Sequence, residues 1–463
     1  MQEDLKTFIE IANKLFEDEQ HNPVVFPINP NELSQHIDLT LNDNPIAYNE
    51  FLETLTKLVL QTPKTSSKLF FNQLFGGRQS KAVLGDLLSI LLNNSMYTYK
   101  VAGPQIGVEK EIINKICNIV GYEDGSGGTF TVGGSMSNFM GMLMARDAAN
   151  LKIREQGFTK PLIAYTSIES HYSIIKSASF IGMGKNNLRF ISTNEKGEML
   201  TSELEKQILE DIANGYTPFF VNATAGTTVL GVFDPIDEIS KVCKRYNLWL
   251  HVDGAYCGGV IFSKKHKSLI NGLEKSDSFN FNAHKMLGTP LVCSVIVVKN
   301  KKHLYNSFSV DADYLYQTDG DDFNLGKTSF QCGRKNEALK LWTLWKSVGT
   351  FGLEKMVNHL FDLSKFAYEY VNKHPDYTVY SSGNSLSICF NYKGIDASNL
   401  CTALYEDAKL VVGFGNFRED KFIRLVTVNA NNTEADILNF FKELEGYVDS
   451  NELTLRTIKK VVS

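Results

Sequence analysis

Between about residues 160 and 300, the chain alternates segments of helical periodicity with short apolar runs rich in β-branched and aromatic residues. Runs that are apolar on both faces are typical of parallel strands covered by helices on both sides. The runs are PLIAYTS from residue 161, LRFIST from 188, TPFFVNAT from 217, LWLHVDG from 248, SFNFNAH from 278 and LVCSVIVVK from 291. This pattern predicts an α/β unit with a mostly parallel sheet.

The pattern changes after about residue 350. The segments YTVYSSGNSLSICFNY from 377 and KFIRLVTVN from 421 predict paired strands, and NNTEADILNFFKELEGYV predicts a capped amphipathic helix after them. The first sixty residues are helical and polar, with proline interruptions, and we expect them to pack on the large domain or on a partner subunit. We therefore predict an N-terminal helical, dimer-packing segment (1–95), a large domain (96–350) and a small C-terminal α+β domain (351–463).

Composition limits the classes of partner. The chain has 47 Lys and Arg against 52 Asp and Glu, with no basic stripe, which argues against nucleic-acid binding. No apolar run reaches the roughly 18 residues that cross a bilayer, and the first residues lack the pattern of a signal peptide. The seven cysteines are scattered without zinc-binding spacing. We expect a cytoplasmic protein with reduced thiols and no membrane partner or metal.

A glycine-rich turn precedes one predicted helix and is a candidate anion site. In open α/β sheets, ligands lie at the carboxyl ends of the strands, so the residues after each run are the ones expected to contact a ligand. Gly133, Gly134, Ser135 and Ser137 lead directly into an amphipathic segment. The free amides of a helix N-terminus and small hydroxyls can bind a phosphate, although the same turn can simply cap a helix.

Three reactive side chains follow other runs. His171, in SIESHYSIIKSA, is either a structural hydrogen-bonding residue or a functional group. Asp253 ends LWLHVD, where a buried carboxylate requires a positive partner unless it only caps a turn. Lys285 follows SFNFNAH, and desolvation there would lower its pKa and favour a Schiff-base nucleophile over a surface lysine.

The combination of these residues is more informative than any one of them. A phosphate site, a histidine able to stack on a ring, a carboxylate able to pair with a pyridinium nitrogen and a Schiff-base lysine are what a protein supplies to pyridoxal 5'-phosphate. The set therefore predicts pyridoxal 5'-phosphate as the cofactor.

With this set, the sequence resembles the pyridoxal-dependent group II decarboxylases, in the branch of glutamate, cysteine-sulfinate and aspartate decarboxylases. The resemblance extends from about residue 25 to about residue 448, and its motifs agree in order and spacing. They are FFNQLFGG from 70, MYTYKVAGPQ from 96, GGSMSN from 133, SHYSIIK from 170, NATAGTTVLGVFDPI from 222, HVDGAY from 251, NFNAHK from 280, QCGRKNEALKLW from 331 and FIRLV from 422. The resemblance implies a fold type I, PLP-dependent transferase-like large domain.

The resemblance also implies roles for individual residues. Lys285 would hold the cofactor as a Schiff base, His171 would stack on its ring, and Asp253 would keep the pyridine nitrogen protonated; these are the expected catalytic residues. Gly333, in SFQCGRK, would reach the phosphate of a neighbouring subunit. The other residues expected to bind the cofactor are Ser135, Met136, Ser137, Thr228, Ala255 and His284.

Three residues are associated with the substrate by the same resemblance. Gln73 and Arg424 would contact its distal acid group, for which a bidentate guanidinium is suited, although an arginine at this place is also seen in aromatic decarboxylases. Phe75 stands where glutamate decarboxylases tend to have serine and cysteine-sulfinate decarboxylases have phenylalanine. A bulky ring should shorten the pocket and favour a three-carbon acidic amino acid.

Two departures from the branch concern the active site. Glutamate decarboxylases carry a loop tyrosine that protonates the substrate carbon, whereas no tyrosine lies between Gln317 and Gln331, and Phe323 takes that place. Protonation would then come from His171 or water, or would occur on the cofactor and inactivate it. Lys100 stands where the branch usually has glutamate, and it either attracts an acid or lies solvated at the rim.

We therefore predict a PLP-dependent carboxy-lyase of amino-acid metabolism. It would remove the α-carboxylate of a small acidic L-amino acid, with cysteine sulfinate or aspartate favoured and glutamate possible, and release CO2 and the amine. The alternatives are an aromatic or diamino acid decarboxylase, a decarboxylation-coupled oxidative deaminase, and a degenerate fold that serves as an interaction subunit. We expect a homodimer with shared active sites, the common state of such enzymes and the default symmetry of soluble oligomers.

Overall fold

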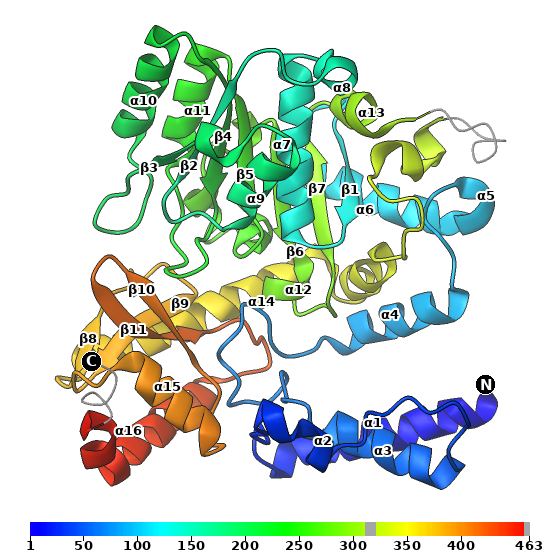
Figure 1. Cartoon of the computed structure of the whole chain (residues 1–463), viewed down its shortest axis with the longest axis vertical. Helices are drawn as coiled ribbons and strands as arrows, with labels where there is room; N and C mark the ends of the chain where they lie inside the picture. Colours follow the sequence, from blue (N-terminus) through cyan, green and yellow to red (C-terminus); the bar gives the residue numbers. More distant parts are fainter. Residues whose placement is uncertain (311–320, 458–463) are drawn as a thin grey trace. The chain divides into compact units, whose positions relative to one another are not determined.

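The structure of the chain, a computed structural model, describes residues 1–310 and 321–457 (Figure 1). The chain forms two units. Unit 1 comprises Met1–Gly77, Leu363–Tyr380 and Ser387–Ser463, and unit 2 comprises Arg78–Asp362 and Ser381–Leu386. This grouping differs from the predicted three segments, because residues 1–77 join the C-terminal region. As a division into parts that fold separately, the three-segment scheme stays a prediction.

Unit 2 is built on a seven-stranded sheet in the order β1-β7-β6-β5-β4-β2-β3. All neighbours are parallel except β7, which is antiparallel to β1 and β6. The predicted α/β class with a mostly parallel sheet is confirmed. The strands are β1 (Gly127–Thr131), β2 (Leu162–Ser167), β3 (Leu188–Ile191), β4 (Thr217–Thr224), β5 (Trp249–Gly254), β6 (Ser278–Asn282) and β7 (Ser294–Val298).

Helices cover both faces of this sheet (Figure 1). Helix α7 (Gly134–Ala149) crosses β4 to β7 and packs beside α9 (Ser173–Phe180). On the other face, the Tyr165 hydroxyl of β2 donates to Asp211 of α10 (Thr201–Ala213) at 3.0 Å, and α11 (Ile236–Tyr246) lies against β4 and β5. The alternation of side chains along each strand separates these two faces.

The remaining helices of unit 2 are shorter or peripheral. They are α4 (Ser80–Leu92), α5 (Tyr99–Ala102), α6 (Pro104–Val120), α8 (Ile153–Gln156), α12 (Ala283–Met286) and α13 (Lys302–Phe308), with the 3₁₀ helices η2 (Lys185–Asn187), η3 (Gly258–Phe262), η4 (Lys267–Ile270), η5 (Leu273–Lys275), η6 (Asp321–Phe323) and η7 (Leu325–Thr328). Helix α14 (Ala338–Lys373) begins in unit 2 and ends in unit 1, with a break in helical geometry at Gly349.

Glycines allow α7 to approach the sheet closely. Gly133 precedes the helix with a φ of 115°, a backbone conformation that favours glycine. Within the helix, a Cβ on Gly141 would lie 2.7 Å from Nδ1 of His251 on β5. A larger residue at position 141 would therefore push the helix away from the polar side chains of β5.

Unit 1 contains an antiparallel sheet in the order β10-β11-β9-β8. Residue Phe71 explains why the N-terminal segment belongs to this unit: its amide donates to the Val411 carbonyl at 2.7 Å, and its ring meets that of Phe440 at 5.1 Å in the core. The elements are β8 (Tyr377–Val379), β9 (Ser387–Tyr392), β10 (Gly413–Phe417), β11 (Asp420–Val426), α1 (Gln2–His21), η1 (Pro30–Glu32), α2 (Leu33–His36), α3 (Tyr48–Gln61), α15 (Ala397–Glu406) and α16 (Glu434–Thr457).

A buried ion pair fixes the segment that carries the QCGRK motif in unit 2. The Arg334 guanidinium donates to both Glu109 carboxylate oxygens, at 2.8 and 2.9 Å, and to Thr129 Oγ1 at 2.9 Å. Both charged side chains are almost completely buried. Since an unpaired buried charge is costly, neither partner can be lost without a large penalty.

We predict that Glu109→Gln lowers the free energy of unfolding by about 3 kcal/mol or more, because it leaves the Arg334 charge buried and uncompensated. Urea unfolding followed by circular dichroism measures the change. Lys206→Ala is the control, since it removes a pair in which both side chains are exposed. Equal unfolding midpoints for the two variants would contradict the prediction.

Candidate active site

The residues predicted to carry chemistry follow the carboxyl ends of parallel strands in unit 2. Strands β1, β2, β4, β5 and β6 run in the same direction, so their carboxyl ends lie along one edge of the sheet. The predicted residues that stand at or just after these ends are Ser135, Met136, Ser137, His171, Thr228, Asp253, Ala255, His284 and Lys285. The topology thus gathers residues that are far apart in the sequence.

Asp253 lies near the end of β5 and is buried, with 3 % of its surface exposed. Its carboxylate accepts hydrogen bonds from Asn138 Nδ2 at 2.7 Å and from the Ala255 amide at 3.0 Å. Within the described ranges, Asp253 forms no ion pair. A buried carboxylate that has no ion pair among the described residues fits a protonated ring nitrogen.

His171 lies at the start of α9 and is half-buried. Burial lowers its pKa, Asp253 opposes this effect, and the charge of Lys285 adds to it. The Ser173 backbone amide lies 3.2 Å from Nδ1 of His171, and because an amide only donates, Nδ1 must accept. The imidazole is therefore neutral, with its proton on Nε2.

Lys285 lies in the short helix α12 and not at the end of a strand, because β6 ends at Asn282. Its side chain is half-buried, and Nζ lies 6.0 Å from the centre of the Tyr256 ring. Its charge acts on the ionisation of both His171 and His284. The structure therefore brings Lys285, His171 and Asp253 into one electrostatic environment.

The predicted phosphate residues occupy different settings. Ser135 is exposed in the first turn of α7, Met136 is half-buried, and the Ser137 hydroxyl is fully buried at 2.7 Å from Thr131 Oγ1. A phosphate would therefore meet Ser135 and the first amides of α7 more readily than the Ser137 hydroxyl. The role of Ser137 stays a prediction.

The other predicted cofactor residues also differ in exposure. A Cβ on Gly134 would lie 2.8 Å from Cβ of Ala255, so the start of α7 adjoins the end of β5. His284 is buried and its Nδ1 accepts from the Cys293 amide at 2.9 Å. Thr228 is half-buried in the turn after β4, and Gly333 is exposed. Their contacts with a cofactor stay predictions.

The three predicted substrate residues belong to unit 1. Arg424 on β11 donates from Nη2 to the Asn72 carbonyl at 3.0 Å, which holds the guanidinium beside the segment of Gln73 and Phe75. Gln73 is exposed, and the half-buried Phe75 ring lies 6.5 Å from that of Phe70. The structure thus brings the two predicted acid-binding segments together.

Comparison with known proteins identifies the family. The sequence pattern described as "Pyridoxal-dependent decarboxylase conserved domain" matches residues 30–393, which is most of the chain. The chain belongs to the pyridoxal-dependent decarboxylases. Its cofactor is pyridoxal phosphate, and the predictions of a carboxy-lyase and of this cofactor are confirmed.

Individual relatives support the same assignment. The chain is 38% identical to acidic amino acid decarboxylase GADL1 of Homo sapiens over 369 residues, 78% of this chain and 71% of the relative. It is 34% identical to cysteine sulfinic acid decarboxylase of Homo sapiens over 440 residues, 90% and 89% of the two chains. The crystal structure of mouse CSAD superposes with a TM-score of 0.90 at 32% identity and covers 95% and 97% of the two chains. The predicted branch of the family and its fold are thereby confirmed.

Sequence reasoning missed several polar residues in the interior of this decarboxylase. Asn138, Ser173, His251 and Asn280 are buried and joined to one another or to Asp253 and His171 by hydrogen bonds. Strand alternation could have indicated His251, since it lies two residues before Asp253 and therefore on the same face. Asn138 gave no such signal, because its partners come from other elements.

The loop that lacks the family tyrosine lies partly outside the described residues, which resume at Asp321. Phe323 is exposed, with its ring 5.6 Å from that of Tyr99 in an edge-to-face arrangement and 4.7 Å from Lys110 Nζ. Lys100 is also exposed, as the solvated interpretation expects.

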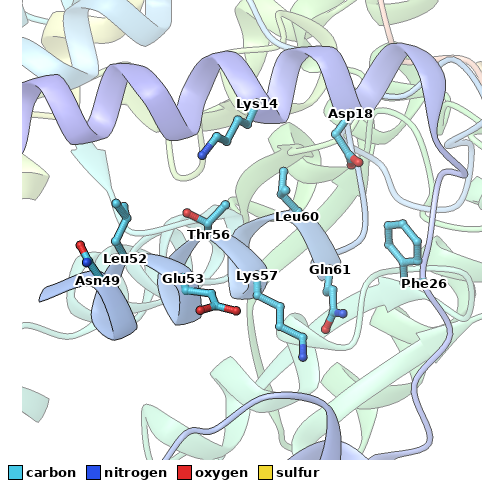
Figure 2. Close-up of a pocket in the computed structure, with 10 residues that line it drawn as sticks. All are labelled: Lys14, Asp18, Phe26, Asn49, Leu52, Glu53, Thr56, Lys57, Leu60 and Gln61. Atoms are coloured by element: carbon cyan, nitrogen blue, oxygen red, sulfur yellow. The ribbon is translucent and has the colours of Figure 1, made fainter. Parts of the chain in front are cut away.

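A separate cavity of about 700 Å³ lies in unit 1 between α1 and α3 (Figure 2). Lys14 and Asp18 of α1 point toward α3, and Thr56 and Leu60 of α3 point toward α1, whereas Glu53 and Lys57 extend to the other side of α3. No predicted catalytic or substrate residue lines this cavity.

In the part of the chain that the structure describes, no helix has the length and apolar character required to cross a membrane.

We predict that His251 and His284 each make the decarboxylase less stable as pH falls from about 6.5 to about 4. Burial lowers the pKa of His251 and of His284 to about 4 in the folded chain, so in this window each histidine binds more protons in the unfolded chain than in the folded one. Burial raises the pKa of Asp234 to about 7, which acts in the opposite direction, so the contribution of one histidine is measured by its substitution.

The measurement is the free energy of unfolding by urea at several pH values. His284→Gln should reduce the loss across the window by on the order of 1–2 kcal/mol. His36→Gln, at an exposed position, serves as control. The same pH dependence in His284→Gln and in the unaltered protein would exclude this origin.

Proposed function

We propose that this decarboxylase acts on a small acidic L-amino acid, with cysteine sulfinate or aspartate favoured and glutamate possible. The observation that carries the proposal is the Arg424–Asn72 hydrogen bond, which holds a guanidinium beside Gln73 and Phe75. A guanidinium pairs well with a carboxylate or a sulfinate. The names of the relatives, acidic amino acid decarboxylase and cysteine sulfinic acid decarboxylase, support the same class.

The residues of unit 2 would bind and orient the cofactor. Bound pyridoxal phosphate supplies a ring that accepts the electron pair left when CO2 departs. The Lys285 amine would bond to the cofactor aldehyde, and the Asp253 carboxylate would keep the ring nitrogen protonated. Ser135, His284 and the first amides of α7 would bind the phosphate. Thr228 and Ala255 would border the ring.

His171 would face the ring and hold a proton at Nε2. Its Nδ1 accepts hydrogen bonds, so Nε2 is the only imidazole nitrogen with a proton to offer. The loop without tyrosine leaves the protonation of the substrate carbon to His171 or to a water molecule. The same absence favours decarboxylation-coupled oxidative deamination as the second candidate, with aromatic and diamino acid substrates as further alternatives.

We further propose that the enzyme is a homodimer with shared active sites, in which Gly333 reaches the neighbouring phosphate. Helix α4 exposes Leu88, Ile90, Leu91 and Leu92, and α1 exposes Phe8 and Phe16. Such a concentration of apolar side chains is typical of a surface that another protein covers. A second copy of the chain is the occupant that the family resemblance favours.

We also propose a cytosolic location. All seven cysteines lie in the described part of the chain and are free thiols, and six of them are buried. Disulfides persist in oxidising compartments, so a chain with seven unpaired thiols suits a reducing one.

We predict that cysteine sulfinate and aspartate are decarboxylated with a kcat/KM roughly 100-fold or more above that for DOPA, because the Arg424 guanidinium pairs with a distal sulfinate or carboxylate that DOPA lacks. Separate incubations with cysteine sulfinate, aspartate, glutamate and DOPA, scored for CO2 and for aldehyde, measure this. Aldehyde in place of amine would instead support oxidative deamination. Equal rates on DOPA and the acids would contradict the proposal.

We predict that Phe75→Ser raises the kcat/KM for glutamate relative to cysteine sulfinate by roughly 10-fold, because a smaller side chain lengthens the pocket. Phe180→Ser, at a well-exposed position of α9, serves as the matched control and should leave the ratio unchanged. If the ratio is unaltered in Phe75→Ser, the Phe75 side chain does not set the length of the substrate that the pocket accepts.

We predict that sedimentation shows a dimer for the unaltered protein and that Leu91→Glu shifts it toward monomer, because a charge is costly to bury in an apolar interface. Leu209→Glu on α10, a leucine of comparable exposure, should leave the dimer intact. A monomeric unaltered protein, or equal effects of both variants, would contradict the proposed interface.

A further inference from the structure

Asn138 occupies a special position between two candidate catalytic residues. It lies in α7, is 1 % exposed, and its amide nitrogen contacts two hydrogen-bond acceptors. One is Asp253 Oδ2 at 2.7 Å, and the other is Ser173 Oγ at 2.9 Å. One side chain thus touches the carboxylate predicted for the ring nitrogen and a neighbour of the histidine predicted to stack on the ring.

The orientation of the Asn138 amide follows from its contacts. Carboxylate oxygens only accept hydrogen bonds, so the nitrogen and not the oxygen of Asn138 must face Asp253. The Asn138 oxygen then accepts from Asn280 Nδ2 at 2.5 Å and lies 3.0 Å from His251 Nε2. If the Asn138 amide were flipped, its oxygen would face the Asp253 oxygen and its nitrogen would face the Asn280 nitrogen.

Both ring nitrogens of His251 join this network. Nε2 lies 3.0 Å from the Asn138 oxygen and 3.1 Å from Asn280 Nδ2, and burial keeps the imidazole neutral by lowering its pKa to about 4. Nδ1 lies 2.8 Å from the Ser278 hydroxyl, which accepts from Trp249 Nε1 at 2.8 Å. Polar side chains of β5 and β6 therefore surround the oxygen of Asn138.

The same reasoning extends from Asn138 toward His171. Ser173 Oγ accepts from Asn138 and lies 2.8 Å from His171 Nδ1. Its hydroxyl proton therefore points to Nδ1, alongside the Ser173 backbone amide. These contacts place the proton of neutral His171 on Nε2.

We propose that Asn138 is a positioning residue of the decarboxylation, which orients the Asp253 carboxylate and directs the Ser173 hydroxyl proton to Nδ1 of His171, so that it reinforces the proton position that the Ser173 amide requires. This inference rests on the roles proposed above for Asp253 and His171. Asn138 acts through these residues, so its loss should alter the environment of the bound cofactor and the turnover more than the binding of the substrate.

The test compares four variants of the full-length protein after loading with pyridoxal phosphate. Asn138→Ala removes both hydrogen bonds, and Ser173→Ala removes only the branch to His171. Asn222→Ala is the matched control, because Asn222 is a fully buried asparagine on β4 of the seven-stranded sheet, where it donates to the Thr166 hydroxyl on β2. Asp253→Asn tests the proposed role of Asp253 itself. Circular dichroism verifies folding.

The readouts are the dissociation constant of pyridoxal phosphate, the pH dependence of its bound visible absorbance, kcat and KM. Asn138→Ala should weaken cofactor binding and lower kcat by roughly 10-fold or more each, as loss of a hydrogen bond to a charged group implies. The midpoint of the absorbance titration should shift, and KM should change less than about 3-fold. Asn222→Ala should change none of these.

A folded Asn138→Ala protein with the absorbance titration and cofactor affinity of Asn222→Ala would overturn the inference. If Asn138→Ala does not fold, Ser173→Ala decides: a kcat lowered roughly 5-fold or more at unchanged cofactor affinity supports the inference, and kinetics equal to the control overturn it. If Asp253→Asn leaves absorbance and affinity unchanged, the proposed role of Asp253 fails and the inference fails with it. If Asp253→Asn changes the absorbance and the cofactor affinity and Asn138→Ala does not, the inference about Asn138 is overturned and the proposed role of Asp253 stands.

Discussion

The buried carboxylate of Asp253 is the constraint around which the active site is organised. Removing a carboxylate from water costs several kcal/mol even after the protein relaxes, and no lysine, arginine or histidine among the described residues forms an ion pair with it. Two hydrogen bonds, from Asn138 and the Ala255 amide, offset part of that cost. On the role proposed for Asp253, a protonated ring nitrogen of pyridoxal phosphate would offset the rest.

The packing of α7 on the sheet of unit 2 supplies this carboxylate with a hydrogen-bond donor away from water. The polar side chains beneath α7 come from adjacent strands in register, with His251 opposite Ser278 and Asp253 opposite Asn280. Helix α7 can deliver Asn138 to them only because Gly141 lets its backbone approach His251. Polar groups in a low-dielectric interior favour a single arrangement when every donor has an acceptor, which is how a buried network becomes rigid.

Much of the fold and of the candidate site could be predicted from the sequence. The apolar runs predicted β2 to β7 because buried parallel strands lack the alternation of exposed ones. Lys285, Asp253 and His171 stood out because reactive side chains at strand ends meet at one edge of a sheet. The contact of the Ser137 hydroxyl with Thr131 could not be predicted, because the sequence does not reveal which way a helical side chain turns, and the phosphate role of Ser137 stays a prediction.

Other features depend on pairings between distant parts of the chain. Residues 1–77 belong with the C-terminal sheet because the Phe71 backbone pairs with Val411, a contact with no local signature. Asn138 and Asp253 are likewise brought together only by the strand order. We propose that this edge of the sheet holds pyridoxal phosphate through Lys285. Borohydride reduction of the loaded protein, followed by proteolysis and mass spectrometry, should find a pyridoxyl group on Lys285. A label on another lysine, or none, would contradict this proposal.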